Sequence, residues 1–345
     1  MNTRYCAGPE LWLKKEILQY ENGNEIPNNL GNRYFCEMPK DTEKKDIKDF
    51  WGSLYYSLYD GVDRELNQTQ LLEALDQLED MFRFRNHMAV TDMPLDNLFG
   101  KRVLEVGPGS GGHSALFAKY GAIVTSADIT IVRAISTQIK FRLLGKIADG
   151  CQSIQSDAEH LPFNDNSFDI VYSNGVLHHT SDSQGAVAEV YRVLKPGGEA
   201  VIMLYCKSSW HYWINMVLAV GILQGRLFCD RNWLGRATEW GGKNQQTVEN
   251  PITKCYSRAG IQKLFKDFHI KGLRKSEFYF YLIPKIGRVY RHWQIKKYGV
   301  HPGGLLVYGE PWPIQSRLEL FLGTIIGWSW FIRAVKSNKE YLLDN

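Results

Sequence analysis

The stretch Val103-Leu104-Glu105-Val106-Gly107-Pro108-Gly109-Ser110-Gly111-Gly112-His113 decides how this chain folds. Its first four residues form a short, mostly apolar run that is typical of a buried strand, and glycines follow at once. Glycine adopts positive φ and lets a backbone approach a ligand closely. The residues from Gly112 onward predict a helix, whose first N–H groups can bind an anionic group. We therefore expect a strand, a ligand-binding turn and a helix.

The sequence around this turn alternates between expected strands and expected helices. Strands are predicted at 102–106, 122–127, 153–156, 168–173 and 199–205, and helices at 112–120, 131–143 and 186–194. The pattern resumes with helices at 257–268 and 315–322 and strands at 270–280 and 325–335. Strand and helix repeated at this interval predict an α/β fold with a doubly wound, mostly parallel sheet and right-handed crossovers.

The flanking segments predict additions to this core. Leu71, Leu75, Leu78 and Phe82 recur with the period of a helix, so we expect a helix at 70–84 that Asn67 or Thr69 caps. We divide the chain into four parts. The first two are an N-terminal extension with a helical cap (1–95) and a cofactor-binding core (96–205), and an inserted aromatic-rich lid over the substrate (206–253) follows. The C-terminal part (254–345) completes the core and contains a basic loop region, and residues 284–313 are expected as loop.

Length and composition describe an ordinary globular chain. It has 345 residues, of which 44% are hydrophobic and 23% are charged, so it needs neither disulfides nor a metal to fold. The six cysteines form no CxxC pair, which excludes a zinc ribbon and is typical of a reducing compartment. The apolar runs at 208–225 and 318–332 are too short to span a bilayer. We expect a cytoplasmic protein without stable membrane insertion.

Charge is unevenly distributed along the chain. The net charge is only +4, but residues 254–297 contain twelve lysines and arginines against two acids. A solvated basic face is the simpler interpretation of such a stretch. The alternatives are attraction to an anionic substrate, to a nucleic acid or to an acidic membrane surface.

Three acids follow three successive strands. Glu105 lies before the first glycine, Asp128 ends the next strand, and Asp157 follows the third. An acid at the position of Asp128 can accept both hydroxyls of a ribose, and Asp157 or its neighbouring backbone could pair with an adenine amino group. Each acid alone could equally be a helix cap or a turn residue. Together they predict an acidic crevice that suits a positively charged nucleoside.

The glycine spacing leaves a second nucleotide open. Gly107, Gly109 and Gly112 also match the GxGxxG pattern of dinucleotide-binding folds, so a nicotinamide-dependent dehydrogenase is an alternative. A tight turn that binds nothing is another. The acidic crevice favours the cationic nucleoside over a phosphate-rich dinucleotide.

At this point the sequence resembles the class I S-adenosylmethionine-dependent methyltransferases, in particular the methyltransferase type 11 group that includes ubiquinone/menaquinone methyltransferases. The resemblance lies in the segments 103–111, 124–128, 157–172, 174–180 and 192–203. It implies a Rossmann-like, seven-stranded sheet. It also implies S-adenosylmethionine as cofactor, S-adenosylhomocysteine as product, no metal, and in-line methyl transfer to O, N or C of a small-molecule acceptor.

The resemblance also implies roles for single residues. Gly107, Gly109 and Gly111 would line the methionine and ribose, and Glu105 would lie near the methionine amino group. The remaining cofactor-binding residues would be Asp128 and Ile129 at the ribose, Asp157 and Ala158 at the adenine, and Asn174 at the methionyl end. Pro108 removes one backbone donor that the family commonly has in this turn.

The acceptor side is predicted from histidines and aromatic residues. His178 and His179 follow Asn174, where the methyl group should point, and they are the candidate catalytic bases, although we expect at least one to pack locally. His113 is expected to cap or pack. The predicted substrate pocket for an anionic or aromatic and apolar acceptor contains Trp51, Tyr55, Tyr205, Trp210 and Trp213. The core of a small cap is the alternative interpretation of these aromatic residues.

Two other functions remain open at this stage. An RNA or protein methyltransferase could use the basic stretch 254–297, but no RNA-binding module is present, and we do not expect nucleic acid as a partner. A non-catalytic protein that binds S-adenosylmethionine is the other. The intact glycine and acidic positions favour an enzyme.

Overall fold

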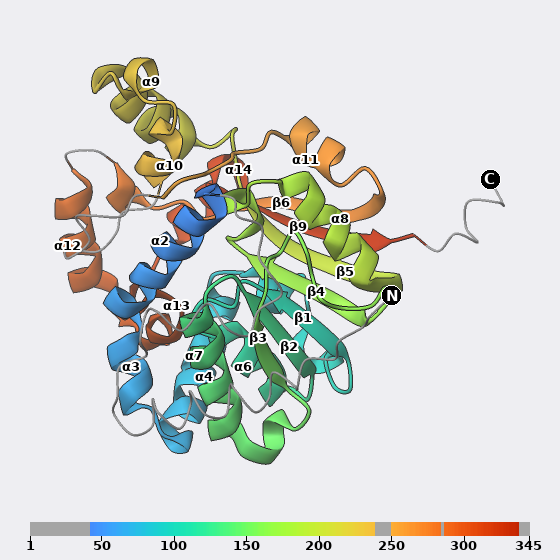
Figure 1. Ribbon diagram of the computed structural model, residues 1–345. Helices are drawn as coiled ribbons and strands as arrows, with labels where there is room; N and C mark the ends of the chain where they lie inside the picture. Colours follow the sequence, from blue (N-terminus) through green and yellow to red (C-terminus); the bar gives the residue numbers. More distant parts are fainter. Residues whose placement is uncertain (1–41, 239–249, 284–285, 338–345) are drawn as a thin grey trace.

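The computed structural model describes residues 42–238, 250–283 and 286–337 (Figure 1). Two parts of the predicted additions, residues 1–41 of the N-terminal extension and residues 239–249 of the inserted cap, lie outside the described residues.

A seven-stranded sheet forms the centre of the molecule, as predicted. Its strands, in the order β3-β2-β1-β4-β5-β9-β6, are β3 (Gln152–Gln155), β2 (Ile123–Asp128), β1 (Arg102–Val106), β4 (Phe168–Asn174), β5 (Leu194–Tyr205), β9 (Ser329–Lys336) and β6 (Phe268–Ser276). The pairs from β3 to β5 are parallel, and β9 is antiparallel to both β5 and β6. Strand order reverses between β1 and β4, and ligands of open α/β sheets bind at the carboxyl ends of the strands at such a reversal.

Helices cover both faces of the sheet. The helices of the core are α4 (Gln68–Phe84), α6 (Gly112–Lys119), α7 (Ile131–Leu144), α8 (Ser183–Val193) and α11 (Arg258–Leu264). Val103 packs into the core under α4, α6 and α7, whereas its neighbour Leu104 packs into the core under α8 and α11. Because β1 is buried on both faces, its sequence is mostly apolar rather than alternating, and its one acid, Glu105, is fully buried.

The N-terminal helices are attached to the core by buried polar contacts. They are α2 (Thr42–Leu58) and α3 (Asp60–Glu65), followed by α4, which Asn67 and Gln70 begin with a capping box. Asp63 on α3 forms a fully buried ion pair with Lys140 on α7 and accepts a 2.8 Å hydrogen bond from Tyr55 Oη. These contacts hold α2 and α3 against α7, the helix that follows β2.

The additions outside the sheet are helices and short ribbons. They are α5 (Met88–Thr91), the π-helix η5 (His211–Leu223), α9 (Arg226–Cys229), α10 (Trp233–Thr238), α12 (Gly287–Tyr298), α13 (Leu305–Tyr308), α14 (Arg317–Ile326), the strands β7 (Val300–His301) and β8 (Trp312–Pro313), and short 3₁₀ turns that include η3 (Gly145–Ala148), η4 (Leu177–His179) and η6 (Phe280–Leu282). Within the described part of the chain, we find no helix that combines the length and the apolarity needed to cross a bilayer.

Two predictions about the C-terminal part were wrong. Residues 284–313 were expected as loop, but α12 occupies 287–298 and β7 pairs with β8. The helical pattern was missed because α12 buries Gly287 and Gln294 instead of an apolar stripe. The strand expected at 325–335 begins only at Ser329, because α14 continues to Ile326 and Gly327 follows as its C-cap.

Candidate active site

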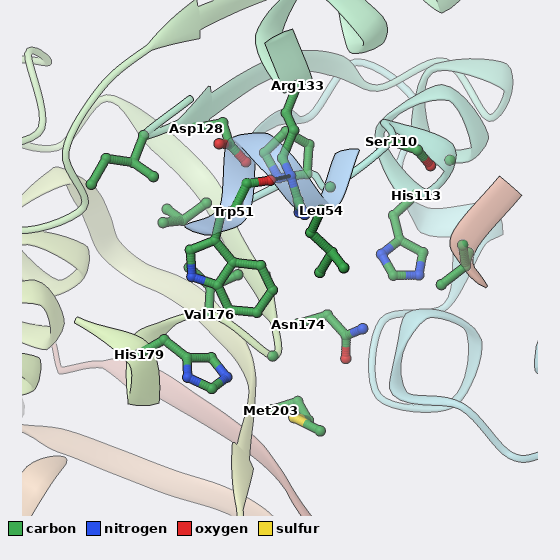
Figure 2. Close-up of a pocket in the computed structure, with 18 of the residues that line it drawn as sticks. Trp51, Leu54, Ser110, His113, Asp128, Arg133, Asn174, Val176, His179 and Met203 are labelled. Carbon is green, nitrogen blue, oxygen red and sulfur yellow. Dashed lines mark hydrogen bonds between the residues drawn. The ribbon is translucent and has the colours of Figure 1, made fainter. Parts of the chain in front are cut away.

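A cavity of about 480 Å³ lies at the carboxyl ends of the parallel strands. Its walls come from the glycine turn, from the ends of β2, β4 and β5, from α2, and from the segments 277–282 and 306–312. Figure 2 shows Asp128, His113, Asn174 and His179 around the same space, with the Trp51 side chain of α2 between Asp128 and His179 in this view. The cavity thus lies at the reversal of strand order that the fold predicts as a ligand site.

Gly107, Gly109 and Gly111 of the turn favour glycine for different structural reasons. Gly107 has φ +74°, and a Cβ there would lie 2.2 Å from Val176 Cγ2. Gly111 has φ +82°, and a Cβ there would lie 2.7 Å from the Cα of Thr137. Gly109 has φ +61°, but a Cβ there would meet only Arg133 Nη1, at 3.7 Å. Gly107 and Gly109 line the cavity, and Gly111 serves the packing of the turn on α7.

This difference predicts opposite results for two alanine variants. We expect Gly111→Ala to lower the free energy of unfolding by about 2 to 4 kcal/mol, because positive-φ strain adds to overlap with backbone that cannot move easily. Gly109→Ala should cost about 1 kcal/mol of stability and weaken nucleoside binding instead. Urea denaturation and calorimetric titration with S-adenosylhomocysteine measure the two quantities. Equal loss of stability in both variants would contradict the assignment.

Asp128 ends β2 and lines the cavity with a buried carboxylate. Its Oδ1 accepts 2.8 Å hydrogen bonds from both the N–H and the hydroxyl of Thr130. Burial raises the pKa of Asp128, and the Thr130 bonds and the charge of Arg133 oppose that rise. Because both bonds end on Oδ1, Oδ2 is the oxygen placed to receive hydroxyls of a ligand. Ile129 follows on the same wall.

Asp157 lines the cavity, but its carboxylate has partners within the protein. Its Oδ2 accepts a 2.5 Å bond from Lys44 Nζ on α2, and its Oδ1 accepts a 2.9 Å bond from the N–H of Glu159. Lys44 also contacts Glu159 Oε2 at 2.8 Å. Asp157, Glu159 and His160 lie close enough to hold a cation together, but Lys44 already compensates the two carboxylates. Ala158 beside them also lines the cavity.

Glu105 does not reach the cavity wall. It is fully buried beneath the turn, where Ser114 Oγ donates to its Oε2, and its Oε1 has no hydrogen-bond partner. His113 lies between Glu105 and the cavity. Its Nδ1 is 3.4 Å from Glu105 Oε1, and its ring lines the cavity, where Nε2 has no hydrogen-bond partner. The sequence expected His113 to cap or pack. The structure places it on the wall in front of Glu105, next to Asn174 (Figure 2).

The two predicted bases have different surroundings. His178 is fully buried, its ring centroid lies 3.9 Å from that of Tyr205, and it does not line the cavity. His179 lines the cavity, and its Nδ1 lies 2.9 Å from the carbonyl oxygen of Ile252. Because a carbonyl only accepts, the tautomer with the hydrogen on Nδ1 satisfies this contact and leaves the lone pair on Nε2. Thr253 Oγ1 and Asn250 Nδ2 lie 3.2 and 3.3 Å from the same Nδ1. Burial lowers the pKa of His179 to about 4, although the Ile252 bond opposes this.

The predicted aromatic pocket is only partly assembled. Trp51 and Tyr205 line the cavity, and the Trp51 ring lies 5.0 Å from His179. Tyr55 points instead to Asp63, Trp210 packs on Phe278, and Trp213 is 53% exposed, so these three do not line it. The wall that the sequence missed consists of Tyr279, Tyr281, Tyr308, Trp312 and Trp328.

Arg85 organises that missed wall from behind. Its guanidinium donates to Tyr308 Oη at 2.8 Å and to Tyr279 Oη, and it lies 3.3 Å from Glu277 Oε1. Burial raises the pKa of Tyr279, Tyr281 and Tyr308, so their hydroxyls stay protonated. A signal for this wall was present in the repeated aromatic residues of 278–281, but they fell in segments interpreted as strand end and loop.

Comparison with known proteins agrees with this site. Residues 104–202 match the family model of a methyltransferase domain. A ubiquinone/menaquinone biosynthesis C-methyltransferase of Haemophilus ducreyi is 37% identical over 112 residues, which are 31% of this chain and 42% of that protein. The cycloartenol-C-24-methyltransferase 1 of Oryza sativa is 34% identical over 114 residues, 33% of each chain. The chain thus spans less than half the length of these two curated relatives.

Solved structures resemble the chain over a larger part. The geranyl diphosphate C-methyltransferase of Streptomyces coelicolor superposes with a TM-score of 0.49 at 14% identity and covers 87% of this chain and 99% of that one. The matched segment 104–202 contains the strands and the glycine turn that build the cavity. The family model and the curated relatives support a class I S-adenosylmethionine-dependent methyltransferase domain over residues 104–202.

Proposed function

We propose that this chain transfers the methyl group of S-adenosylmethionine to a small-molecule acceptor. The observation that carries the proposal is the continuity of the cavity, which joins Asp128 and the glycine turn at one end to His179, Tyr205 and the tyrosine wall at the other. A donor and an acceptor can therefore meet in one enclosed space. The C-methyltransferase relatives match over the donor-binding part of the chain, so they do not by themselves indicate an acceptor.

The residues present fit the proposed donor. Asp128 Oδ2 would hold the ribose hydroxyls, and Ala158 would contact the adenine. His113 Nε2, which has no partner, would accept from the methionine amino group, so that Glu105 acts through His113 rather than directly. Asn174, Gly107 and Gly109 would border the methionyl end. The carboxylate of Asp157, which the sequence assigned to the adenine, is engaged by Lys44, so we propose the backbone beside it for that contact.

The protein's contribution to the reaction is mainly orientation. The bound donor supplies an activated methyl group on a sulfonium, which needs an acceptor lone pair in line with the S–CH₃ bond. Trp51 and Tyr205 line the cavity and would help to exclude water from the bound substrates. Holding both partners in one geometry can supply about 7 to 11 kcal/mol. His179 Nε2 would take the proton that a hydroxyl or amine acceptor must lose.

The acceptor end favours an apolar or aromatic molecule with a polar group. Its walls are aromatic, and the protonated tyrosine hydroxyls offer hydrogen-bond donors. The charge of Glu277 there is met by Arg85 and by the hydroxyl of Ser329. Among the described residues, the lysine and the arginine that line the cavity are Lys44 and Arg133, which lie near Asp157 and Asp128 at the donor end, so an anionic acceptor is the weaker of the two predicted types.

Binding and turnover test the proposed function separately. We expect calorimetry to show micromolar binding of S-adenosylhomocysteine, and labelled S-adenosylmethionine to transfer its methyl group to at least one phenol, hydroxylated aromatic or amine in a panel. Absence of binding at millimolar ligand would refute the proposal. Binding without transfer to any acceptor would favour the non-catalytic alternative.

The role of His179 can be tested by substitution and by pH. His179→Ala should lower kcat about 100-fold, at the lower end of general-base effects, with little change in S-adenosylhomocysteine affinity. Because the pKa of His179 is about 4, the imidazole is neutral and able to accept a proton from pH 8 down to about 5. The kcat of the wild type should therefore fall on acidification near pH 4 rather than near pH 6.5. His178→Ala is the comparison variant, and an equal kcat loss there would contradict the assignment.

A further inference from the structure

The exposed large apolar side chains of this protein are concentrated on four neighbouring helices. We use the term outer face for the exposed residues of η5, α9, α12 with the preceding Ile286, and α14. Phe228 is 77% exposed, Leu223 75% and Val289 72%. The exposed apolar residues of the outer face are Trp213, Ile214, Leu218, Ile222, Leu223, Leu227, Phe228, Ile286, Val289, Trp293, Ile295, Leu318, Phe321 and Ile325. Such a concentration marks an interaction site.

Three of these helices, η5, α12 and α14, are joined around η6, and α9 packs on η5. Asn215 Nδ2 on η5 donates to the carbonyl oxygen of Leu282 at 2.7 Å. Glu319 on α14 accepts from the N–H of Phe280 at 3.0 Å and from Gln294 Nε2 on α12 at 3.1 Å. In Figure 1, η5, α9 and α12 project from the side of the molecule remote from β1 to β3. The outer face is therefore one structural unit.

Two of these helices have their polarity inverted. On α14 the buried residues are Glu319 and Gly323, whereas Leu318, Phe321 and Ile325 recur at helical spacing and are each more than half exposed. On α12 the buried residues are Gly287 and Gln294, and Ile286, Val289 and Trp293 form the exposed stripe. Water alone does not favour this arrangement, because the apolar stripe of a surface helix normally faces the core.

The charges on the same helices are positive. Arg226, Arg231, Arg288, Lys296, Lys297 and Arg317 belong to these helices or directly follow them. Among the described residues, the acids nearby are paired or buried: Asp230 pairs with Arg236, Glu310 pairs with Arg291, and Glu319 is fully buried. Exposed apolar residues combined with lysine and arginine suit the interface of an anionic bilayer, into which apolar side chains insert while cations contact the headgroups.

We propose that the outer face docks on an anionic lipid membrane surface. This is peripheral binding, in agreement with the lack of a spanning helix among the described residues. The docked face borders the cavity, because Leu282 both accepts the bond from η5 and lines the cavity wall. The proposal does not depend on methyl transfer, and its test measures lipid binding alone.

Vesicle flotation of the full chain tests the proposal directly. We expect the protein to float with vesicles of phosphatidylcholine and phosphatidylglycerol, to float less as salt rises, and to remain in solution with phosphatidylcholine alone. No flotation with the anionic vesicles, even at low salt, would overturn the proposal. Equal binding to both vesicle types would overturn the claim that the cations of the outer face recognise anionic headgroups.

Matched variants locate the contact. Leu223→Ser/Phe228→Ser and Arg288→Glu/Lys296→Glu should each lower the vesicle partition coefficient about tenfold or more. Ile147→Ser and Lys146→Glu change an exposed apolar residue and an exposed lysine on η3, outside the outer face, and should leave binding unchanged. Circular dichroism confirms folding of each variant. Equal effects of both sets on vesicle binding would overturn the assignment. A wild-type dimer in sedimentation velocity that the outer-face variants dissociate would also overturn it, because a second copy of the chain would then cover the outer face.

Discussion

Asp128→Ala is expected to weaken the binding of S-adenosylhomocysteine at least about 100-fold. Oδ2 of this buried carboxylate is the proposed acceptor for two ribose hydroxyls, since Thr130 occupies Oδ1. Each hydrogen bond to a charged group contributes about 1.5 to 3 kcal/mol, so two of them amount to about 3 to 6 kcal/mol. Isothermal titration calorimetry measures the loss.

Two further variants make this result specific to Asp128. Asp128→Asn keeps an oxygen for Thr130 and removes only the charge, so it should retain the fold and lose part of the affinity. Asp149→Ala removes an exposed acid from the loop before β3 and should bind like the wild type. A change below about threefold in Asp128→Ala would mean that the ribose is held elsewhere, even if methyl transfer persists.

The sequence predicted the parts of the site that local pattern determines. The run 103–113 specifies strand, turn and helix through short-range preferences, and parallel strands bring their carboxyl ends to one edge. Asp128, Asn174 and Ala158 therefore line the cavity as expected. His113 packs against Phe82 and Tyr172, as expected. Its contact with Glu105 was not predicted, because it depends on the depth at which each side chain lies, which residue spacing does not specify.

The acceptor wall could not be predicted because it depends on tertiary packing. Tyr279 comes from one segment and Tyr308 and Trp312 from another, and Arg85, far away in the sequence, contacts all three. Tyr55 and Trp51 lie one helical turn apart, yet they point to different partners, Asp63 and the cavity. Helix α12 was expected as loop because it lacks the buried apolar stripe by which helices are usually recognised.

Lys140→Met is expected to lower the free energy of unfolding by about 3 to 5 kcal/mol. The ammonium of Lys140 and the carboxylate of Asp63 are both fully buried and pair with each other. Removing the lysine leaves a buried carboxylate without its counter-ion, which is strongly destabilising. Urea denaturation gives the change. Lys119→Met, which breaks the partly exposed pair with Asp76, is the control and should cost no more than about 1 kcal/mol.

The double variant Asp63→Leu/Lys140→Met separates the missing counter-ion from lost packing. Replacing both members of a buried pair by apolar residues is often close to neutral, so the double variant should recover most of the loss. Ser136 Oγ keeps its 3.0 Å bond to the carbonyl oxygen of Ser110, but Tyr55 loses its acceptor, so recovery should fall short by about 1 to 3 kcal/mol. A double variant less stable than Lys140→Met would contradict this account. It would mean that the ion pair stabilises the protein by attaching α3 to α7. Nucleoside affinity should then fall together with stability, because α2, which precedes α3, lines the cavity.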